Sequence, residues 1–385
     1  MHQLPLPSLE EKKISDALIK VIISDIKQKN GFLPFHEYIN SVLYFPTLGY
    51  YSNNKEKIGI HGDFITAPNL HPIFAKTLAQ QIADVLKNTQ KNIYEFGAGT
   101  GNLATDLLNF IPTHLVENYY IIDISKNLST QQSNNIQSRA PQHFGKVKHL
   151  STLPEQFNGV IIGNEVLDAI PFNLIEKKDN NFFEMGVSLD ANNELTLSSR
   201  PLTQKLLLNE AQEYLIHCPE PYQTELHLQQ KAFIKTICQK IGTAAAIFID
   251  YGFEATQYYH PQRSMGTMMG HYQHHSISDP FFYPGLIDLT CHINFSTIAD
   301  SIVNTKTDLI GYTSQSIFLM NLGIIDHLSE LSADTTNPNY LKASQACQLL
   351  INPQEMGEFF KVMAFAKNVD IEWQGFISGD WTHKL

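Results

Sequence analysis

Apolar residues in the middle of the chain form short continuous runs that alternate with segments of helical periodicity. After the first run, for example, Leu103, Leu107 and Leu108 recur at helical spacing. Strands buried on both faces read as near-continuous apolar runs, whereas helices repeat apolar residues every three or four positions. The alternation therefore predicts an α/β fold with a doubly wound parallel sheet that begins near Lys91. The expected strands are 92–96, 119–123, 147–150, 159–163 and 243–250.

The flanking segments follow other patterns. An apolar stripe at helical spacing over 8–30 and an aromatic-rich stretch over 35–51 predict an N-terminal helical and aromatic extension. Three short strand-like pieces over 172–199, separated by Asp- and Asn-rich turns, predict an antiparallel insertion. The expected organisation is an accessory region, 1–90, and a main domain, 91–385, interrupted by an insertion at about 172–240.

Three glycines follow the first predicted strand at alternate positions, Gly97, Gly99 and Gly101. Because glycine has no Cβ, such a loop lets a ligand lie close to the backbone at the carboxyl end of a strand. A dinucleotide site has the spacing G-x-G-x-x-G, and here the third glycine comes one residue earlier. The alternative is a glycine turn that binds no ligand.

Two carboxylates favour a particular kind of ligand for this loop. Glu95 precedes the first glycine by two residues, where it would repel a phosphate but suit a cationic group such as an amino-acid ammonium. Asp123 ends the second predicted strand, the usual position of a carboxylate that accepts from ribose hydroxyls. The E-x-G-x-G-x-G loop with Asp123 resembles the first motif of S-adenosylmethionine-dependent methyltransferases.

The net charge, the cysteines and the apolar runs of the chain argue against several classes of protein. The net charge of −11 disfavours a general nucleic-acid binder, whose affinity rests on neutralising phosphates. The four cysteines are scattered and form no C-x-x-C pair, so neither a zinc site nor a disulfide framework is expected. The first residues lack the pattern of a secretory signal, and no apolar run approaches the length of a membrane span. We therefore expect a cytoplasmic protein.

Further motifs, in this order, resemble those of the MidA-like family of S-adenosylmethionine-dependent methyltransferases. The most specific are Gly62-Asp-Phe-Ile-Thr-Ala-Pro68 and Asn164-Glu-Val-Leu-Asp-Ala-Ile-Pro171. The others are Leu48–Tyr51, Glu95–Gly101, Ile249–Gly252, Asp288–Thr290 with His292, Thr313–Gln315 and Met356–Lys361. Family members often have Pro and Arg in the glycine loop where this chain has Ala98 and Thr100, both small enough for the turn.

The resemblance implies a class I methyltransferase fold, which is Rossmann-like with a seven-stranded sheet and an antiparallel last strand, here 358–366. It also implies that residues 1–90 and 172–240 build an accessory layer over the active site. The implied cofactor is S-adenosyl-L-methionine. The mitochondrial member of the family is a complex I assembly factor that methylates a protein arginine, so a protein substrate is implied, in a respiratory complex or elsewhere.

The implied cofactor contacts follow the ends of the strands. Glu95 would lie near the methionine ammonium, and Asp123 would accept from the ribose hydroxyls. Leu150 and Ser151, after the third strand, are expected at the adenine. The expected cofactor-binding residues are Thr66, Glu95, Gly97, Ala98, Gly99, Gly101, Asp123, Ile124, Leu150, Ser151 and Asn164.

Catalytic candidates follow the fourth strand, beside the expected methyl group. A carboxylate can orient a guanidinium through paired hydrogen bonds and accept the proton that it loses on methylation. Glu165 is the first candidate for this role and Asp168 the second. The alternative is that both carboxylates cap a following helix.

Three functional hypotheses remain at this point: a protein methyltransferase, an assembly factor that binds the cofactor without catalysis, and a small-molecule methyltransferase. The histidines at 271, 274 and 275 have no fixed acidic partner, and methyl transfer needs no metal, so a metal site is not expected there. Asp250 and His292 are expected either to support the site from nearby or to be buried polar residues with satisfied hydrogen bonds.

Overall fold

The computed structural model describes residues 4–53, 66–123, 126–332 and 334–385. The chain divides into two compact units, each built from three segments. We call them the sheet unit and the accessory unit. The sheet unit contains Ile65–Val166, Phe233–Gly252 and Ile298–Leu385. The accessory unit contains Met1–Phe64, Leu167–Ala232 and Phe253–Thr297.

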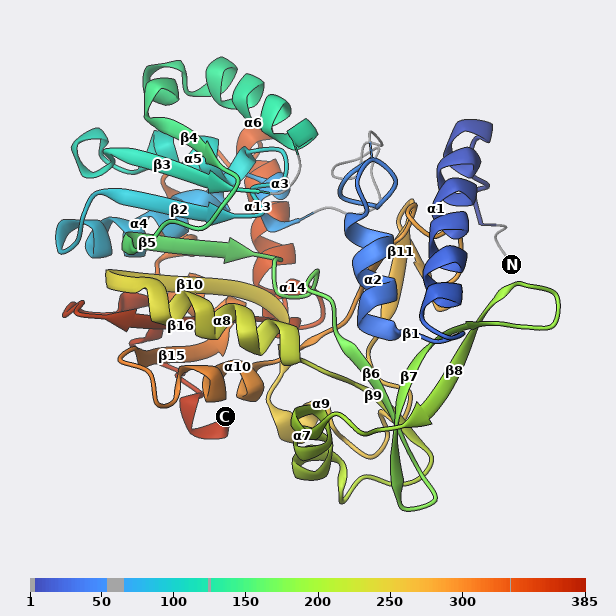
Figure 1. Cartoon of the computed structure of the whole chain (residues 1–385). Helices are drawn as coiled ribbons and strands as arrows, with labels where there is room; N and C mark the ends of the chain where they lie inside the picture. Colours follow the sequence, from blue (N-terminus) through green and yellow to red (C-terminus); the bar gives the residue numbers. More distant parts are fainter. Residues whose placement is uncertain (1–3, 54–65, 124–125, 333) are drawn as a thin grey trace. The chain divides into compact units, whose positions relative to one another are not determined.

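Seven strands of the sheet unit form one sheet in the order β15-β16-β10-β5-β2-β3-β4 (Figure 1). The five from β10 to β4 are parallel, and β16 runs antiparallel to both of its neighbours. The predicted class I methyltransferase fold with an antiparallel last strand is therefore confirmed. The sheet counts eight strands rather than seven, because the two-residue strand β14 (Ile293–Asn294) also pairs with β10. The strands are β2 (Asn92–Phe96), β3 (Asn118–Ile122), β4 (Val147–Leu150), β5 (Phe157–Asn164), β10 (Ile241–Phe253), β15 (Asp308–Ser314) and β16 (Phe360–Lys367).

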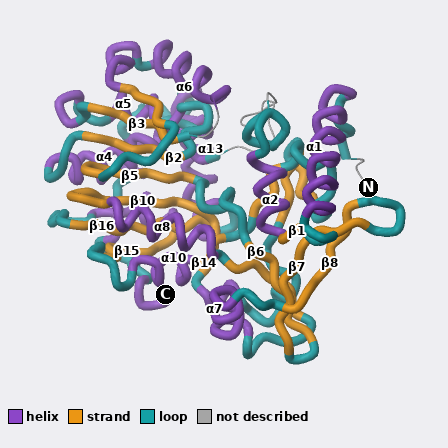
Figure 2. Tube along the Cα trace, viewed as in Figure 1, coloured by secondary structure: helices purple, strands orange, loops and turns teal. Residues whose placement is uncertain are grey.

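Helices pack against both faces of this sheet (Figure 2). The first to follow a strand is α5 (Asn102–Phe110), which leaves the glycine loop and packs against α4 (Ile73–Lys87). The next is α6 (Lys126–Arg139), which packs against α5. The remaining helices are α3 (Ala67–Leu70), α8 (Leu228–Lys240), α10 (Phe295–Ile302), α11 (Gln315–Asn321), α12 (Ile324–Ser329), α13 (Pro338–Ile351) and α14 (Met356–Phe359), and the 3-10 turns are η1 (Thr113–Leu115), η2 (Pro141–Lys146), η3 (Gln374–Phe376) and η4 (Thr382–Lys384).

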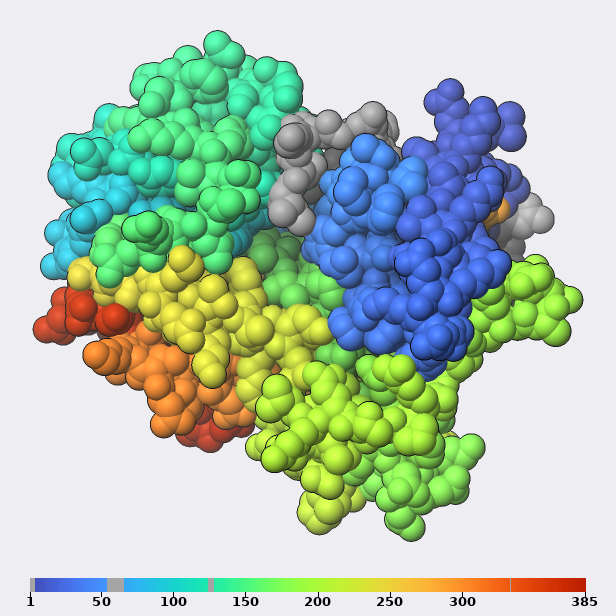
Figure 3. All heavy atoms as spheres, in the orientation of Figure 1, coloured from blue at the N-terminus to red at the C-terminus, as the bar shows by residue number. Residues whose placement is uncertain are grey.

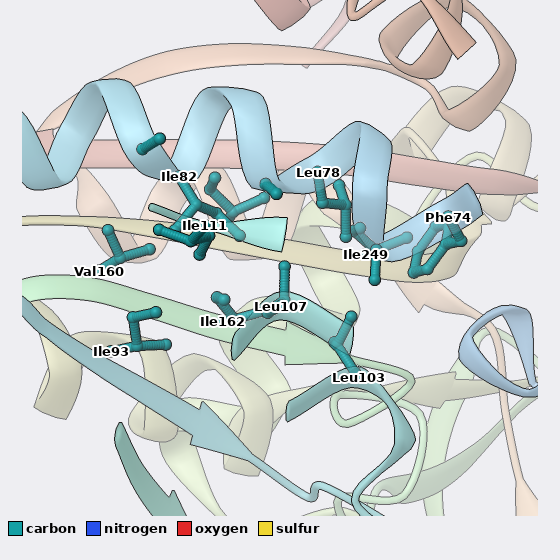
Figure 4. Packing of buried hydrophobic residues seen from close by; sticks show 14 of the residues in the cluster. Phe74, Leu78, Ile82, Ile93, Leu103, Leu107, Ile111, Val160, Ile162 and Ile249 are labelled. Carbon is teal, nitrogen blue, oxygen red and sulfur yellow. The ribbon is translucent and has the colours of Figure 1, made fainter. Parts of the chain in front are cut away.

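The core of the sheet unit lies where one face of the sheet meets α4 and α5 (Figure 4). Because side chains alternate across a strand, Ile93 and Ile162 point to this face. There they meet Phe74 and Leu78 of α4 and Leu107 of α5. Each such buried aliphatic side chain contributes about 1.5–3 kcal/mol from its removal from water. The opposite face is aromatic, because the rings of Phe96 and Phe248 both lie against Phe233 of α8.

The accessory unit begins with α1 (Leu9–Gln28), whose blue atoms are at the surface in Figure 3. A capping box starts this helix: Glu11 N–H donates to the Ser8 hydroxyl, and Ser8 N–H donates to the Glu11 carboxylate. Its apolar stripe, including Leu18 and Ile22, is buried. The next helix is α2 (Phe35–Tyr44), and the two others in this unit are α7 (Lys205–Leu215) and α9 (Ala255–Tyr258).

The predicted antiparallel insertion is present as β6 (Asn173–Lys178), β7 (Asn181–Leu189) and β8 (Leu195–Pro201). Two strands extend it to a five-stranded sheet, β1 (Leu33–Pro34) beside β7 and β9 (Tyr222–Leu226) beside β6. A second, three-stranded sheet consists of β11 (Met269–Tyr272), β12 (His275–Ile277) and β13 (Asp288–Thr290). The N-terminal aromatic segment contributes core: Tyr38 is fully buried, and its hydroxyl donates to the Pro280 carbonyl at 2.7 Å.

One segment differs from its predicted structure. Helical periodicity predicted a helix over 224–241, but Tyr222–Leu226 is strand β9 and the helix α8 starts at Leu228. Pairing with β6 explains the difference, because Thr224 and Leu226 lie opposite Ile175 and Asn173. In the part of the chain that the structure describes, no helix is both long and apolar enough to cross a membrane.

Candidate functional site

The glycine loop leaves β2 at its carboxyl end and enters α5. Gly97, Gly99 and Gly101 all have positive φ, at 59°, 53° and 81°. Residues other than glycine rarely adopt a positive φ, so the path of the backbone requires glycine at these three positions. The loop is also packed on two sides. A Cβ on Gly97 would lie 3.2 Å from Cγ2 of Val166, and one on Gly101 would lie 3.1 Å from Cα of Gln132.

Glu95 is a buried carboxyl group on β2, with 3% of its surface exposed. Its Oε2 accepts a 2.7 Å hydrogen bond from the hydroxyl of Tyr119 on the neighbouring strand β3. Burial raises the pKa of Glu95 to about 7, although the Tyr119 hydrogen bond acts in the opposite direction and nearby Asp123 adds to the rise. The group therefore changes charge near neutral pH.

Asp123 directly follows β3, and a buried glutamine holds it. Nε2 of Gln132, on α6, donates to Oδ2 of Asp123 and to the carbonyl of Gly99, each at 3.0 Å. Oε1 of Gln132 lies 3.0 Å from Nε2 of His149 on β4. One side chain thus links the carboxylate after β3, the glycine loop and β4. The predicted cofactor residue Ile124 lies outside the described residues.

Thr66 is connected to the start of α5 by a chain of amide side chains. Its hydroxyl accepts from Nδ2 of Asn69 at 2.8 Å, and Oδ1 of Asn69 accepts from Asn102. Oδ1 of Asn102 in turn accepts from Asn135 of α6 at 2.8 Å. Asp63, which belongs to the same Gly62–Pro68 motif as Thr66, lies outside the described residues. Thr66 and the glycine loop are therefore tied together through the first residue of α5.

The remaining predicted cofactor residues lie at strand ends or within the loop. Leu150 is the last residue of β4, half-buried and opposite Ile122 of β3. Ser151 follows it and is exposed. Ala98 is buried between two of the loop glycines.

The segment after β5 has an unusual backbone. Glu165 follows the last strand residue, Asn164, and has a φ of 53°, in the left-handed region that non-glycine residues rarely adopt. Its N–H donates to the carbonyl of Ile249 on β10 at 2.8 Å. Oε1 of Glu165 accepts from Nδ2 of Asn164 at 3.1 Å. Residues 165–172, all described, form turns and bends without a helix, so the helix-capping alternative is excluded.

Asp168 belongs to the accessory unit, where it is buried. Tyr51 of the same unit donates from its hydroxyl to both carboxylate oxygens of Asp288, at 2.9 and 3.0 Å. Burial raises the pKa of Tyr51 far above its usual range, and the charges of Asp288 and Asp168 add to this effect. Residues from three separate family motifs are therefore neighbours within this unit.

His271 lies on β11, His275 lies on β12, and His274 lies in the turn between these strands. Across residues 4–53, 66–123, 126–332 and 334–385, no group of three or more His, Cys, Asp and Glu side chains could hold a metal ion.

Sequence reasoning missed Tyr119 and the polar side chains that support the loop, namely Gln132, Asn135, Asn69 and Asn102. A local signal existed for two of these residues, because Gln132 and Asn135 are three positions apart and share one face of α6. Nothing local indicated that this face would meet the glycine loop.

The chain is similar to several known proteins. Residues 77–313 match the family described as "Putative S-adenosyl-L-methionine-dependent methyltransferase". A protein from Burkholderia thailandensis, whose crystal structure has S-adenosyl-homocysteine bound, is 41% identical over the full length of both chains, with a TM-score of 0.95. A native crystal structure from the same organism is also 41% identical over both full chains, with a TM-score of 0.92.

More distant relatives have named activities. The mitochondrial protein arginine methyltransferase NDUFAF7 of Danio rerio is 25% identical, over 94% of this chain and 90% of the relative. The human protein of the same name is also 25% identical, over 88% of this chain and 80% of the relative.

Proposed function

This chain belongs to the S-adenosyl-L-methionine-dependent methyltransferase family, and we propose that it methylates the side chain of an arginine in a protein substrate. Its cofactor is S-adenosyl-L-methionine. The names of the NDUFAF7 relatives support arginine as the acceptor. The observation that carries the proposal is the left-handed backbone of Glu165, because strained residues cluster where geometry serves function.

The residues around the glycine loop fit the cofactor. A Cβ at Gly97 or Gly101 would crowd Val166 or Gln132, so the loop needs glycine at these positions. Without side chains there, the methionine portion could approach the backbone closely. Glu95 would hold the ammonium group, and Asp123 would accept from the ribose hydroxyls. Thr66, Ala98, Leu150, Ser151 and Asn164 would complete the cofactor contacts, with Leu150 and Ser151 at the adenine. When bound, the cofactor supplies an electrophilic methyl group on a sulfonium.

Glu165 would act on the acceptor. A carboxylate can bind a guanidinium through two parallel hydrogen bonds, which orients one nitrogen toward the methyl group. The pKa of arginine is above about 12, so the attacking nitrogen must lose a proton as the bond forms, and the Glu165 carboxylate would accept it. The hydrogen bond from Asn164 would keep that carboxylate oriented. Asp168 is the second candidate for contact with the guanidinium.

The test uses methyl-labelled cofactor, purified protein and a cell extract of proteins. We expect label in one protein band and methylarginine after its acid hydrolysis. Glu165→Gln should lower the rate by at least about 100-fold, as expected for the loss of a proton acceptor. Glu155→Gln is the matched control, because Glu155 is exposed just before the other end of β5. Its rate should be unchanged.

Two outcomes would contradict the proposal, and each favours a different alternative. Label confined to the low-mass fraction would indicate a small-molecule methyltransferase. Tight binding of S-adenosyl-homocysteine without transfer to any acceptor would indicate an assembly factor that uses the cofactor only as a ligand.

A further inference from the structure

Asp250 is a buried carboxylate on β10 that is not among the predicted cofactor-binding residues. Only 1% of its surface is exposed. Its Oδ2 accepts from the N–H of Val166 at 3.1 Å, and its Oδ1 accepts from the N–H of Tyr251 at 3.0 Å. The first of these bonds reaches the residue that directly follows Glu165.

Two consecutive amides of the Glu165 turn are therefore bound by two consecutive residues of β10. The Glu165 N–H donates to the Ile249 carbonyl, and the Val166 N–H donates to the Asp250 carboxylate. A left-handed conformation is unfavourable at a non-glycine residue. A hydrogen bond from a backbone N–H to a buried carboxyl group is stabilising, so the Asp250 bond acts against the strain at Glu165.

The same turn is packed against the glycine loop through the side chain of Val166. A Cβ placed on Gly97 would lie 3.2 Å from Cγ2 of Val166, and one on Gly163 would lie 3.5 Å from the same atom. Val166 therefore sits beside the first glycine of the loop. The residue whose amide Asp250 binds is therefore also packed against the glycine loop.

A buried lysine lies opposite Asp250 on the neighbouring strand. Lys361 of β16 is its direct partner in the antiparallel register, and 5% of its surface is exposed. Nζ of Lys361 donates to the Glu358 and Phe359 carbonyls. Directly opposed residues of an antiparallel pair share one face of the sheet, so Asp250 and Lys361 lie on the same face of neighbouring strands.

We propose that Asp250 is a positioning residue that holds Glu165 in its left-handed conformation, through the Val166 amide, beside the glycine loop. The inference rests on the proposed role of Glu165. Asp250 itself would contact neither the substrate nor the cofactor. Its carboxylate would set the position and direction of the Glu165 side chain by holding the backbone of the turn.

The first experiment is a crystal structure of Asp250→Ala with S-adenosyl-homocysteine bound. We expect φ of Glu165 to leave the positive region, because the compensating hydrogen bond is gone. A φ that stays near 53° would overturn the inference whatever the activity of the protein. Asp250→Asn provides a second variant if the alanine protein does not fold. Its amide has a single oxygen for two N–H donors, so the turn should still be perturbed.

The second experiment compares turnover with cofactor binding. Asp250→Ala should lower kcat by about 10- to 100-fold, the scale of a misplacement of about 1 Å. The Kd of S-adenosyl-homocysteine should change much less. Asp380→Ala is the control, because Asp380 also accepts a backbone N–H, from Tyr312 of β15 at 2.9 Å, elsewhere in the same unit. That variant should keep its kcat.

A double variant separates this inference from the proposed function. If Asp250 acts through Glu165, Asp250→Ala combined with Glu165→Gln should be no slower than Glu165→Gln alone. If the losses of the two single variants multiply in the double variant, Asp250 is a merely structural residue. The same conclusion follows if Asp250→Ala loses kcat, cofactor affinity and Tm to an equal degree. Full activity of Glu165→Gln would instead contradict the proposed role of Glu165, and the φ of Glu165 in Asp250→Ala would still decide the inference.

Discussion

The hydroxyl of Tyr119 donates a 2.7 Å hydrogen bond to Oε2 of Glu95, across the parallel pair β3 and β2. Both side chains are buried, and the pKa of Glu95 is raised to about 7. The carboxyl group nearest the glycine loop on β2 is therefore only partly ionised at neutral pH before a ligand binds. An ammonium group beside it would favour the ionised form, so ligand binding and proton release should be coupled.

Cofactor affinity should depend on pH through Glu95. Below about pH 7 the free protein holds a proton on Glu95 that an ammonium ligand must displace. We expect the Kd of S-adenosyl-homocysteine to rise as the pH falls, by up to roughly tenfold per pH unit. Calorimetry between pH 5 and pH 8 checks this. Glu95→Gln should bind weakly with no such pH dependence, and an unchanged profile in that variant would assign the titration to another group.

The stability of the cofactor-free protein should respond to Glu95 with the opposite sign. The pKa of Glu95 is raised in the folded state, from 4.5 to about 7, so between these values the folded protein binds more protons than the unfolded chain. The Glu95 contribution to the free energy of unfolding therefore falls as the pH rises through this window. Denaturant titrations of Glu95→Gln should lack this component. A wild-type minus variant difference that grows with pH would contradict it.

Tyr119→Phe removes a hydrogen bond that lowers the pKa of Glu95. The pKa should then rise further, and the pH midpoint of S-adenosyl-homocysteine binding should move above 7. Tyr120→Phe is the control, because Tyr120 is the neighbouring residue on β3 and stacks on Tyr94 instead. Its midpoint should not move. Equal shifts in both variants would mean that the effect comes from general loosening of β3.

Gln132→Leu should weaken cofactor binding while leaving the sheet intact. The variant loses a donor to the Asp123 carboxylate and to the Gly99 carbonyl. Loss of a hydrogen bond to a charged acceptor costs about 1.5–3 kcal/mol, which is roughly a tenfold or larger rise in Kd. Gln142→Leu is the control, because Gln142 is exposed and bonds only to Asn109 among the described residues. Matching affinities in the two variants would remove Gln132 from the cofactor site.

Gly101→Ala and Gly31→Ala form a matched pair. Both glycines have positive φ, at 81° and 88°, so each variant should lose about 1–2 kcal/mol of stability. Only Gly101 is crowded, because its added Cβ would lie 3.1 Å from Cα of Gln132, whereas nothing lies within 4 Å at Gly31. Gly101→Ala should therefore also lose affinity for S-adenosyl-homocysteine. An equal affinity in both variants would show that the loop tolerates the displacement.

Much of the sheet unit could be predicted because its signals are local. The run Asn92–Phe96, the glycines after it and the helical spacing from Leu103 lie within about one strand and one helix of each other. The insertion strands were found by their turns in the same way. Strand β9 was missed because Thr224 and Glu225 are not apolar. Glu225 is fully buried, and its carboxylate accepts hydrogen bonds from Tyr258 and Thr267, both distant in sequence.

The sequence alone was enough to predict a glycine loop between a strand and a helix, the carboxylates that flank it and a polar segment after β5, because each depends on residue type and short spacing. It could not indicate which side chains would support them. Tyr119 reaches Glu95 only because β2 and β3 pair in one register. Asp250 reaches Val166 only because β10 lies beside β5, although the two residues are separated by 84 positions. Such contacts depend on which strands become neighbours, and that is decided by packing of the whole unit rather than by any local pattern.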